Sequence, residues 1–374
     1  MPVGLHVDST MKRNTFTFLL FFICLIGCAA GSVKPLLELP GFKAENQPVR
    51  TLRVLLITDD SYRKDEIERW MARCSDLVEV QVGIRLKIVG WQRVTWDKEL
   101  NDIFRTHVRM AADTWTGREN FDIAVAPVHF TQRMGGGKLL LGAVDTFFWR
   151  YIFVKELDPN ILLHELFHAF LLSTAHSDDW VMKAERSAYG VEWYWLTPEQ
   201  RRVVLGNKWR DFNATPVTGD FEGQKWKEGR FYYALGSLYL QRKEFNLAVP
   251  MLAKSLELDP KFAPTYNDLA WIFATADEAS FRNGQEAVRL ALEACELSNW
   301  KNPGYFDTLA AAYARAGNFG KAVHWQEKAL QGMKAPGSDL ERTLEPLKSY
   351  DHDRTSEHRQ RLVLYRMQKP WPPD

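Results

Sequence analysis

The chain has 374 residues, a length that allows two or three domains with substantial hydrophobic cores. Hydrophobic residues make up 46% and charged residues 25%, which is typical of a globular protein and argues against a disordered or fibrous one. The formal net charge is +1, so no overall electrostatic field favours nucleic acid or an anionic surface as a partner.

The N-terminus has the features of an export signal. Lys12 and Arg13 precede an apolar run over residues 16–26, which is short for a helix that spans a bilayer. The run is followed by a glycine and Cys28, and this resembles a bacterial lipoprotein signal, whose cysteine is lipidated and becomes the mature N-terminus. We therefore predict a signal segment at 1–28, a lipid anchor on Cys28 and a place in the cell envelope, facing outside the cytoplasm. The alternatives are an uncleaved membrane anchor and an ordinary signal peptide.

The cysteines indicate no disulfide framework. Of the four, Cys24 and Cys28 belong to the signal segment. The other two, Cys74 and Cys295, fall in what we predict to be different domains. The exported chain is therefore expected to rely on its hydrophobic cores rather than on disulfide bonds.

Residues 29–50 mix prolines, glycines and polar residues, and we expect them to form a tether. After the tether, buried-strand patterns alternate with amphipathic-helix patterns. Strands are predicted at 52–58, 86–91, 121–126, 139–144 and 149–155, and helices at 62–80, 98–112 and 161–172. This order, βαβαβββα, predicts an α/β domain with one mixed sheet at about 51–212.

The last of these helices carries the main chemical motif. The segment 161–172 is apolar except for His164, Glu165 and His168, which form the H-E-x-x-H signature of zinc proteases. An aspartate and a proline at 158–159 predict the helix N-cap and first turn. Residues four apart share a helix face, so both imidazoles point to one place, with Glu165 beside it. This suits two Zn²⁺ ligands and a general base; the competing interpretation is two core histidines with accidental spacing.

The order of elements and this motif together resemble the metzincin metalloproteases, most closely their reprolysin-like bacterial branch. Met182 lies 18 residues after His164, a usual separation for the methionine turn of this family. Residues 175–179 resemble the segment around the family's third histidine, and 196–212 resemble the helix that closes its domain. The resemblance covers about residues 50–212. It implies zinc-dependent hydrolysis of peptide bonds, with the motif glutamate as base and the methionine beneath the site.

Two departures from the family motif, H-E-x-x-H-x-x-G-x-x-H, concern the third ligand. The family glycine falls on Leu171, and the third histidine falls on Thr174. His176 comes two residues later and can bind the metal only if the chain turns back near residues 173–174. We predict His176 as the third zinc ligand; the alternative is a surface histidine at the helix exit. Two glutamates further along are rivals for the role, in the manner of the gluzincins: Glu185 and Glu192.

From about residue 229 the sequence matches the tetratricopeptide pattern. Three copies share small and aromatic residues at equivalent positions, among them Leu235, Gly236, Tyr239, Ala248 and Leu252, then Tyr266, Leu269, Ala270, Ala287 and Ala291, then Phe306, Leu309, Ala310, Tyr313 and Ala322. Small residues at these positions let two antiparallel helices approach closely. The pattern predicts a linker at 213–228, three repeats at 229–336, and capping helices and a tail at 337–374.

The predicted fold is an α/β metzincin-like domain followed by an all-α tetratricopeptide solenoid. The predicted function is that of a lipid-anchored, extracytoplasmic zinc metallopeptidase that acts on a peptide or protein substrate. The concave face of the repeats is expected to bind a protein partner, with a spacer or brace as the alternative role. A second hypothesis is a catalytically inactive protease fold that serves as a binding scaffold in the envelope, which Leu171 and Thr174 favour.

Overall fold

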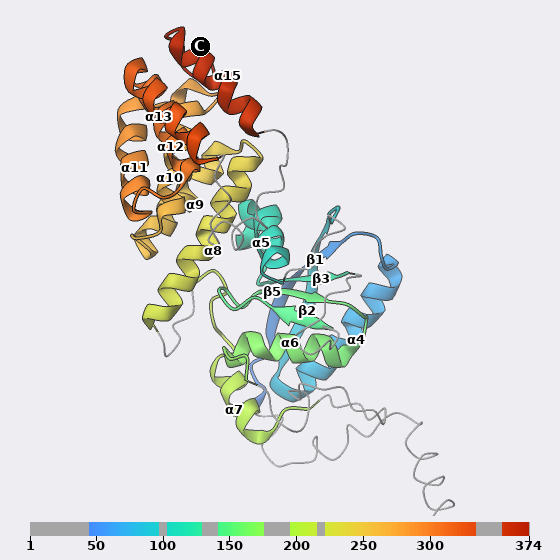
Figure 1. Ribbon diagram of the computed structural model, residues 1–374. Coiled ribbons are helices and arrows are strands. Elements are labelled where there is room, and N and C mark those ends of the chain that lie inside the picture. Colours follow the sequence, from blue (N-terminus) through green and yellow to red (C-terminus); the bar gives the residue numbers. More distant parts are fainter. Residues whose placement is uncertain are drawn as a thin grey trace, which may run out of the picture.

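The computed structural model describes residues 45–96, 103–128, 141–175, 195–214, 221–333 and 354–373. The chain forms an α/β region around one sheet, followed by a region built only of helices (Figure 1). No helix within the described ranges is long and apolar enough to cross a membrane. The predicted signal segment, with Cys28, lies outside the described residues.

The α/β region has the predicted order of elements. Its members are β1 (Arg50–Thr58), α4 (Lys64–Val82), β2 (Ile84–Arg93), α5 (Ile103–Thr114), the 3-10 helix η1 (Trp115–Asn120), β3 (Ile123–Pro127), β4 (Gly142–Val144), β5 (Tyr151–Val154) and α6 (Pro159–Leu171). The prediction of a mixed α/β sheet is therefore confirmed. The observed strands are shifted from the predicted ranges by one to three residues at most ends, where strand patterns merge into turns.

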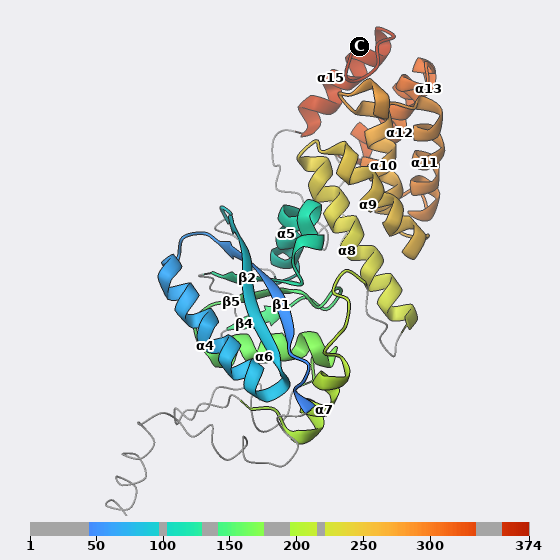
Figure 2. The same cartoon turned by 180° about the vertical axis from the view of Figure 1, so that it is seen from behind.

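The sheet has five strands in the order β2-β1-β3-β5-β4. All neighbouring pairs are parallel except β4 and β5, which are antiparallel, with Ala143 opposite Phe153. Alternate residues of β1 point to opposite faces, as the strand period of two requires. Leu52 and Leu56 accordingly contact the core under α4 and α6, whereas Ile57 contacts the core under α5. Helices α4 and α6 thus cover one face, and α5 covers the other (Figure 2).

A short helix, α7 (Pro198–Gly206), follows in the segment predicted to close the domain. It begins at a capping box in which Thr197 accepts a hydrogen bond from the Gln200 backbone N–H. Just after it, the buried ammonium group of Lys208 donates to the carbonyl oxygens of Asn46 and Pro48, at 2.7 Å each. These hydrogen bonds connect the end of the α/β region to the residues just before β1.

The helical region contains α8 (Phe221–Gln241), α9 (Phe245–Leu258), α10 (Ala263–Thr275), the 3-10 helix η3 (Ala279–Phe281), α11 (Gly284–Leu297), α12 (Pro303–Arg315), α13 (Phe319–Gly332) and α15 (Arg354–Arg366). Successive helices pack in pairs, α8 with α9, α10 with α11 and α12 with α13. The first pair is close because Gly236 has no side chain, since a Cβ there would lie 2.6 Å from Cγ of Leu252. Helix α8 begins inside the stretch expected to be a linker, 213–228.

The C-terminal helix α15 covers the end of the stack. Its Tyr365 is fully buried against α12 and α13. Arg361 donates to the buried carboxylate of Asp307 at 3.0 Å, which anchors α15 to α12 by a charge-assisted hydrogen bond. This helix falls within the stretch 337–374, where capping helices and a tail are predicted, and residues 334–353 lie outside the described residues.

The two regions meet through α5, which lies between the sheet and α8 (Figures 1 and 2). The rings of Phe147 and Phe231 pack with centroids 4.6 Å apart, and one hydrophobic core runs from the sheet into the helical region. Tyr239 on α8 donates to the carbonyl oxygen of Ala112 at 2.8 Å. The contact between regions is therefore apolar at its centre.

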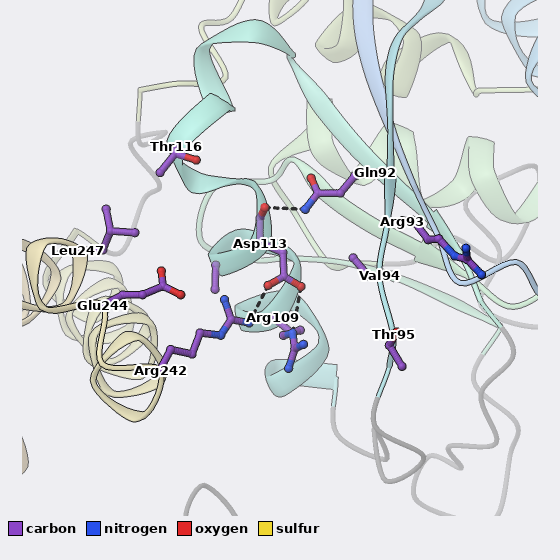
Figure 3. A pocket seen from close by; sticks show the side chains of 11 residues that line it. Gln92, Arg93, Val94, Thr95, Arg109, Asp113, Thr116, Arg242, Glu244 and Leu247 are labelled. Atoms are coloured by element: carbon purple, nitrogen blue, oxygen red, sulfur yellow. Dashed lines mark hydrogen bonds and ion pairs between the residues drawn. The ribbon is translucent and has the colours of Figure 1, made fainter.

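A polar hollow of about 460 Å³ borders this contact, between the end of β2, α5 and the turn from α8 to α9. Figure 3 shows that Asp113 on α5 pairs with two arginines, Arg109 of its own helix at 2.9 Å and Arg242 in the turn after α8 at 2.6 Å. Gln92 at the end of β2 donates to the backbone carbonyl of Asp113 at 2.6 Å. These bonds join β2, α5 and the turn after α8, and they pair Asp113 with two of the arginines that line the hollow.

Candidate metal centre

Helix α6 begins as the sequence predicts. Asp158 has extended backbone dihedrals, and its side chain accepts a hydrogen bond from the backbone N–H of Asn160 at 2.9 Å. Pro159 occupies the first turn, where backbone N–H groups have no acceptor within the helix, so a residue without an N–H is tolerated. Most of the helix is buried, so its polar side chains are held in an apolar environment.

The two motif histidines lie together on one face of α6. The Nε2 atoms of His164 and His168 are 3.0 Å apart, and the ring planes are nearly perpendicular at 84°. Two nitrogen ligands of a tetrahedral zinc ion, each about 2.0–2.1 Å from the metal, lie roughly 3.3 Å apart. The predicted convergence of both imidazoles is therefore observed, at a separation that is within hydrogen-bond distance and also close to that of two ligands of one metal ion.

His168 is oriented by the backbone that leaves the helix. Its Nδ1 atom lies 2.5 Å from the carbonyl oxygen of Ser173, an acceptor, so Nδ1 carries the proton and donates it. The lone pair of the ring is then on Nε2, the atom that faces His164. A hydrogen bond of this kind fixes the tautomer and ring plane of metal-binding histidines in general.

The contact with Ser173 depends on a sharp end to α6. Leu172 takes the left-handed conformation with φ of 52°, and its N–H donates to the carbonyl oxygen of His168 at 2.9 Å. The helix thus ends one residue after Leu171 and without a glycine, while the path of the chain to His176 lies outside the described residues. An L-residue in this conformation is disfavoured by roughly 1–2 kcal/mol, so the surrounding packing must hold it.

Glu165 lies beside the histidine pair and faces the edge strand β4. Burial raises the pKa of its carboxyl group to about 8, and a hydrogen bond from the backbone N–H of Val144 partly opposes that rise. The close approach of β4 requires Gly142, because a Cβ there would lie 3.0 Å from Cγ of Glu165 and 2.9 Å from Cγ2 of Ile161. A carboxyl group with a pKa near neutrality can both accept and release a proton.

The remaining predicted site residues are not placed. His176, Met182, Glu185 and Glu192 all lie outside the described residues. Within the described ranges, no group of three or more His, Cys, Asp or Glu side chains is arranged to hold a metal ion. The structure therefore brings together two of the three predicted zinc ligands and places the predicted base on the same helix against β4, and the identity of the third ligand stays a prediction.

Sequence reasoning missed the residue that shapes the strand beside Glu165. The buried carboxylate of Asp145 accepts hydrogen bonds from five backbone N–H groups in the turn between β4 and β5, at 2.6–3.2 Å: those of Phe147, Phe148, Trp149, Arg150 and Tyr151. The available signal was a lone aspartate between two apolar strand patterns. Such a residue stabilises a turn, because its carboxylate accepts the hydrogen bonds of backbone N–H groups that have no strand partner there.

Comparison with known proteins identifies the repeat in the helical region. The tetratricopeptide repeat family matches residues 229–262, which span most of α8, α9 and the turn after it. No curated protein matches the sequence. Among solved structures, the crystal structure of an archaemetzincin from Methanopyrus kandleri is similar at 18% identity, with a TM-score of 0.33, over 43% of this chain and 97% of that one. The chain thus combines a mixed α/β region with a helical C-terminal region that contains a tetratricopeptide repeat.

Proposed function

We propose that the protein is a zinc-dependent metallopeptidase whose α/β region hydrolyses peptide bonds. The observation that carries the proposal is the geometry at α6, where the Nε2 atoms of His164 and His168 are 3.0 Å apart and Glu165 is buried beside them. The hydrogen bond from His168 Nδ1 to Ser173 supports it, because it leaves the lone pair of the ring on Nε2, the atom that faces His164.

His164 and His168 would hold the metal, with His176 as the proposed third ligand. A zinc ion bound there supplies a Lewis acid that polarises a peptide carbonyl and makes nearby water more acidic. Glu165 would accept a proton from the attacking water and return it to the leaving amine, a role that suits a carboxyl group held by β4 at the rim of the site. Met182 would lie beneath the histidines and shape the site.

The edge of the sheet offers a place for an extended substrate. Among the described strands, β4 is the outermost at this side of the sheet, and it lies against Glu165. An extended peptide that pairs with an edge strand gains backbone hydrogen bonds independent of its side chains. A substrate bound in this way would pass its backbone beside the base.

The rest of the proposal concerns location and partners. We propose that the chain is exported, cleaved before Cys28 and anchored in the cell envelope by lipid on that cysteine, outside the cytoplasm. The helix pairs α8–α9, α10–α11 and α12–α13 would form a tetratricopeptide solenoid, a fold whose repeats each contact mainly their neighbours. Its concave face would bind a protein partner or position the substrate, and no role with nucleic acid is proposed.

The decisive experiment is metal analysis of the soluble chain that begins after Cys28. We expect about one zinc ion per chain in the wild type and in Glu165→Gln, and weakened zinc binding in His176→Ala. Peptide hydrolysis should fall by about 10² or more in Glu165→Gln, because the variant keeps the metal and lacks the base. The exposed His324 on α13 provides a control, since His324→Ala should change neither readout.

A second candidate function is a protein-binding scaffold built on an inactive protease fold. The replacement of the family glycine and third histidine by Leu171 and Thr174 favours it. Zinc-free wild-type protein with normal folding would support this function and remove the peptidase proposal. Zinc in wild type together with unchanged hydrolysis in Glu165→Gln would contradict the assigned base.

A further inference from the structure

The connection between α11 and α12 lies at the other end of the molecule from α6 (Figure 1). Where it contacts α13, an aromatic hollow is present. Its volume is about 400 Å³, and it is lined by Trp300, Phe306, Trp325 and Lys328. Small-molecule sites commonly have volumes of about 300–1,000 Å³, so the hollow is large enough for roughly two sugar rings. It is independent of the metal centre and of the proposed peptidase function.

Trp300 stacks on both other rings of this aromatic hollow, whereas Phe306 and Trp325 are tilted by 43° with centroids 5.5 Å apart. Trp300 and Trp325 stack with centroids 5.1 Å apart and an interplanar angle of 24°. Trp300 and Phe306 make a looser stack at 6.3 Å and 28°. Trp300 packs against the other two rings and keeps 40% of its side chain exposed, so it offers apolar ring surface on which a ring-shaped ligand can stack.

Burial alone does not explain the position of Trp300. Its side chain is 40% exposed, and its backbone takes a left-handed conformation with φ of 55°, as does the preceding Asn299 with φ of 51°. The N–H of Trp300 donates to the carbonyl oxygen of Cys295 at 2.8 Å, which holds the turn at the end of α11. A bulky side chain in this conformation is unfavourable, and such strain is commonest at functional sites.

The charge of the hollow restricts the ligand. The ammonium group of Lys328 lies 4.6 Å from the centroid of Trp325, and none of the four lining residues is acidic. A cationic ligand would be repelled by Lys328, which already occupies an indole face. Single-stranded nucleic acid is disfavoured as well, because it is bound along a track of several cations, and this hollow offers one.

We infer that the aromatic hollow binds an acidic carbohydrate, a chain of sugar rings that carry carboxylates. The apolar C–H faces of a pyranose ring are attracted to the negative faces of the indoles. Lys328 pairs with the carboxylate, and His324, whose ring lies edge-on to Trp325 at 5.4 Å, is placed to hydrogen-bond with hydroxyl groups. The site would hold an acidic polysaccharide at the helical end of the molecule while the α/β region acts elsewhere.

The test is calorimetric titration of the full chain, in detergent, with the trisaccharide of galacturonic acid and with its neutral methyl ester. Trp300→Ala should weaken binding of both sugars about tenfold through lost stacking. Lys328→Gln should weaken only the acidic sugar, about fivefold, because the ester has no charge to pair. Trp209→Ala removes a tryptophan that is 60% exposed near α7 and should leave both affinities unchanged.

Several outcomes would overturn the inference. They are absence of trisaccharide binding at millimolar concentration, equal affinity in wild type and Trp300→Ala, or equal loss of both sugars in Lys328→Gln. Binding of a proline-rich peptide or of a single-stranded oligonucleotide in place of the sugar, with the same dependence on Trp300, would assign the hollow to another ligand class. Thermal unfolding checks that Trp300→Ala is folded. If that variant does not fold, Lys328→Gln tests the inference instead, because Lys328 is exposed and its substitution should not affect folding.

Discussion

The Nδ1 atom of His168 lies 2.5 Å from the carbonyl oxygen of Ser173, a residue beyond the end of α6. The imidazole is therefore oriented by backbone that has already left the helix. That backbone reaches the ring only because Leu172 turns the chain through a left-handed conformation, with φ of 52°. The geometry of the histidine pair thus depends on the helix terminus as much as on the motif itself.

The turn at Leu172 can be tested by substitution. Leu172→Val should destabilise the protein by about 1–3 kcal/mol, because a β-branched residue is poorly tolerated at positive φ. Leu172→Gly should be nearly neutral, since relief of backbone strain offsets the lost side-chain contacts. Urea denaturation measures both. Leu171→Val, one residue earlier and still helical, is the control, and an equal effect at both positions would contradict the assigned strain.

The close approach of β4 to α6 predicts sensitivity at Gly142. Gly142→Ala should destabilise the protein by about 1–3 kcal/mol, because the added Cβ would lie within 3.0 Å of Ile161 and Glu165. Zinc content and hydrolysis should fall with it. Gly320→Ala in α13 is the matched control, since a Cβ there meets nothing within 4 Å. Gly320→Ala should leave the free energy of unfolding unchanged or raise it. An unchanged free energy of unfolding in Gly142→Ala would show that β4 can move away from α6 without loss of stability.

The turn between β4 and β5 predicts a large effect at Asp145. Asp145→Asn should destabilise the protein by about 2–4 kcal/mol, because an amide nitrogen would replace one carboxylate oxygen and oppose backbone N–H donors. The free energy of unfolding from urea titration measures the loss. Asp277→Asn, which affects an exposed pair with Lys243, should change it by less than about 0.5 kcal/mol. Equal effects would mean that the turn is held mainly by apolar packing.

The two described cysteines predict a dependence on alkaline pH. Burial raises the pKa of Cys295 to about 12 and that of Cys74 above its ordinary range. The folded chain then keeps protons that the unfolded chain loses near pH 9, so the free energy of unfolding should fall as pH rises from about 9 to 12. Native protein should not react with a thiol reagent at pH 8, and unfolded protein should. Rapid labelling of the native chain would show that these thiols are accessible.

Much of the fold could be predicted because local patterns determine it. The apolar alternation of β1, the cap at Asp158 and the small residues that pair α8 with α9 act within a few residues, and the structure contains each as expected. The convergence of His164 and His168 follows from helix geometry alone. These features could be derived without knowledge of tertiary contacts.

The rest depends on contacts between distant segments. Neither the bond from His168 to Ser173 nor the approach of Gly142 to Glu165 has a sequence signature, since each requires a particular turn or strand position. The left-handed turn at Leu172 is the clearest example, because the sequence places a residue there that seldom adopts it. The repeat pattern also does not reveal the start of α8, since that helix begins before the pattern does.

Helix α5 has one face on the sheet and the other on α8, and the rings of Phe104 and Phe231 meet edge to face across that boundary, with centroids 6.0 Å apart. A substitution on α5 therefore alters two neighbours at once. Removal of either region would expose the apolar surface that the other region covers. The helical region is therefore a structural part of the α/β region, since it covers one face of α5.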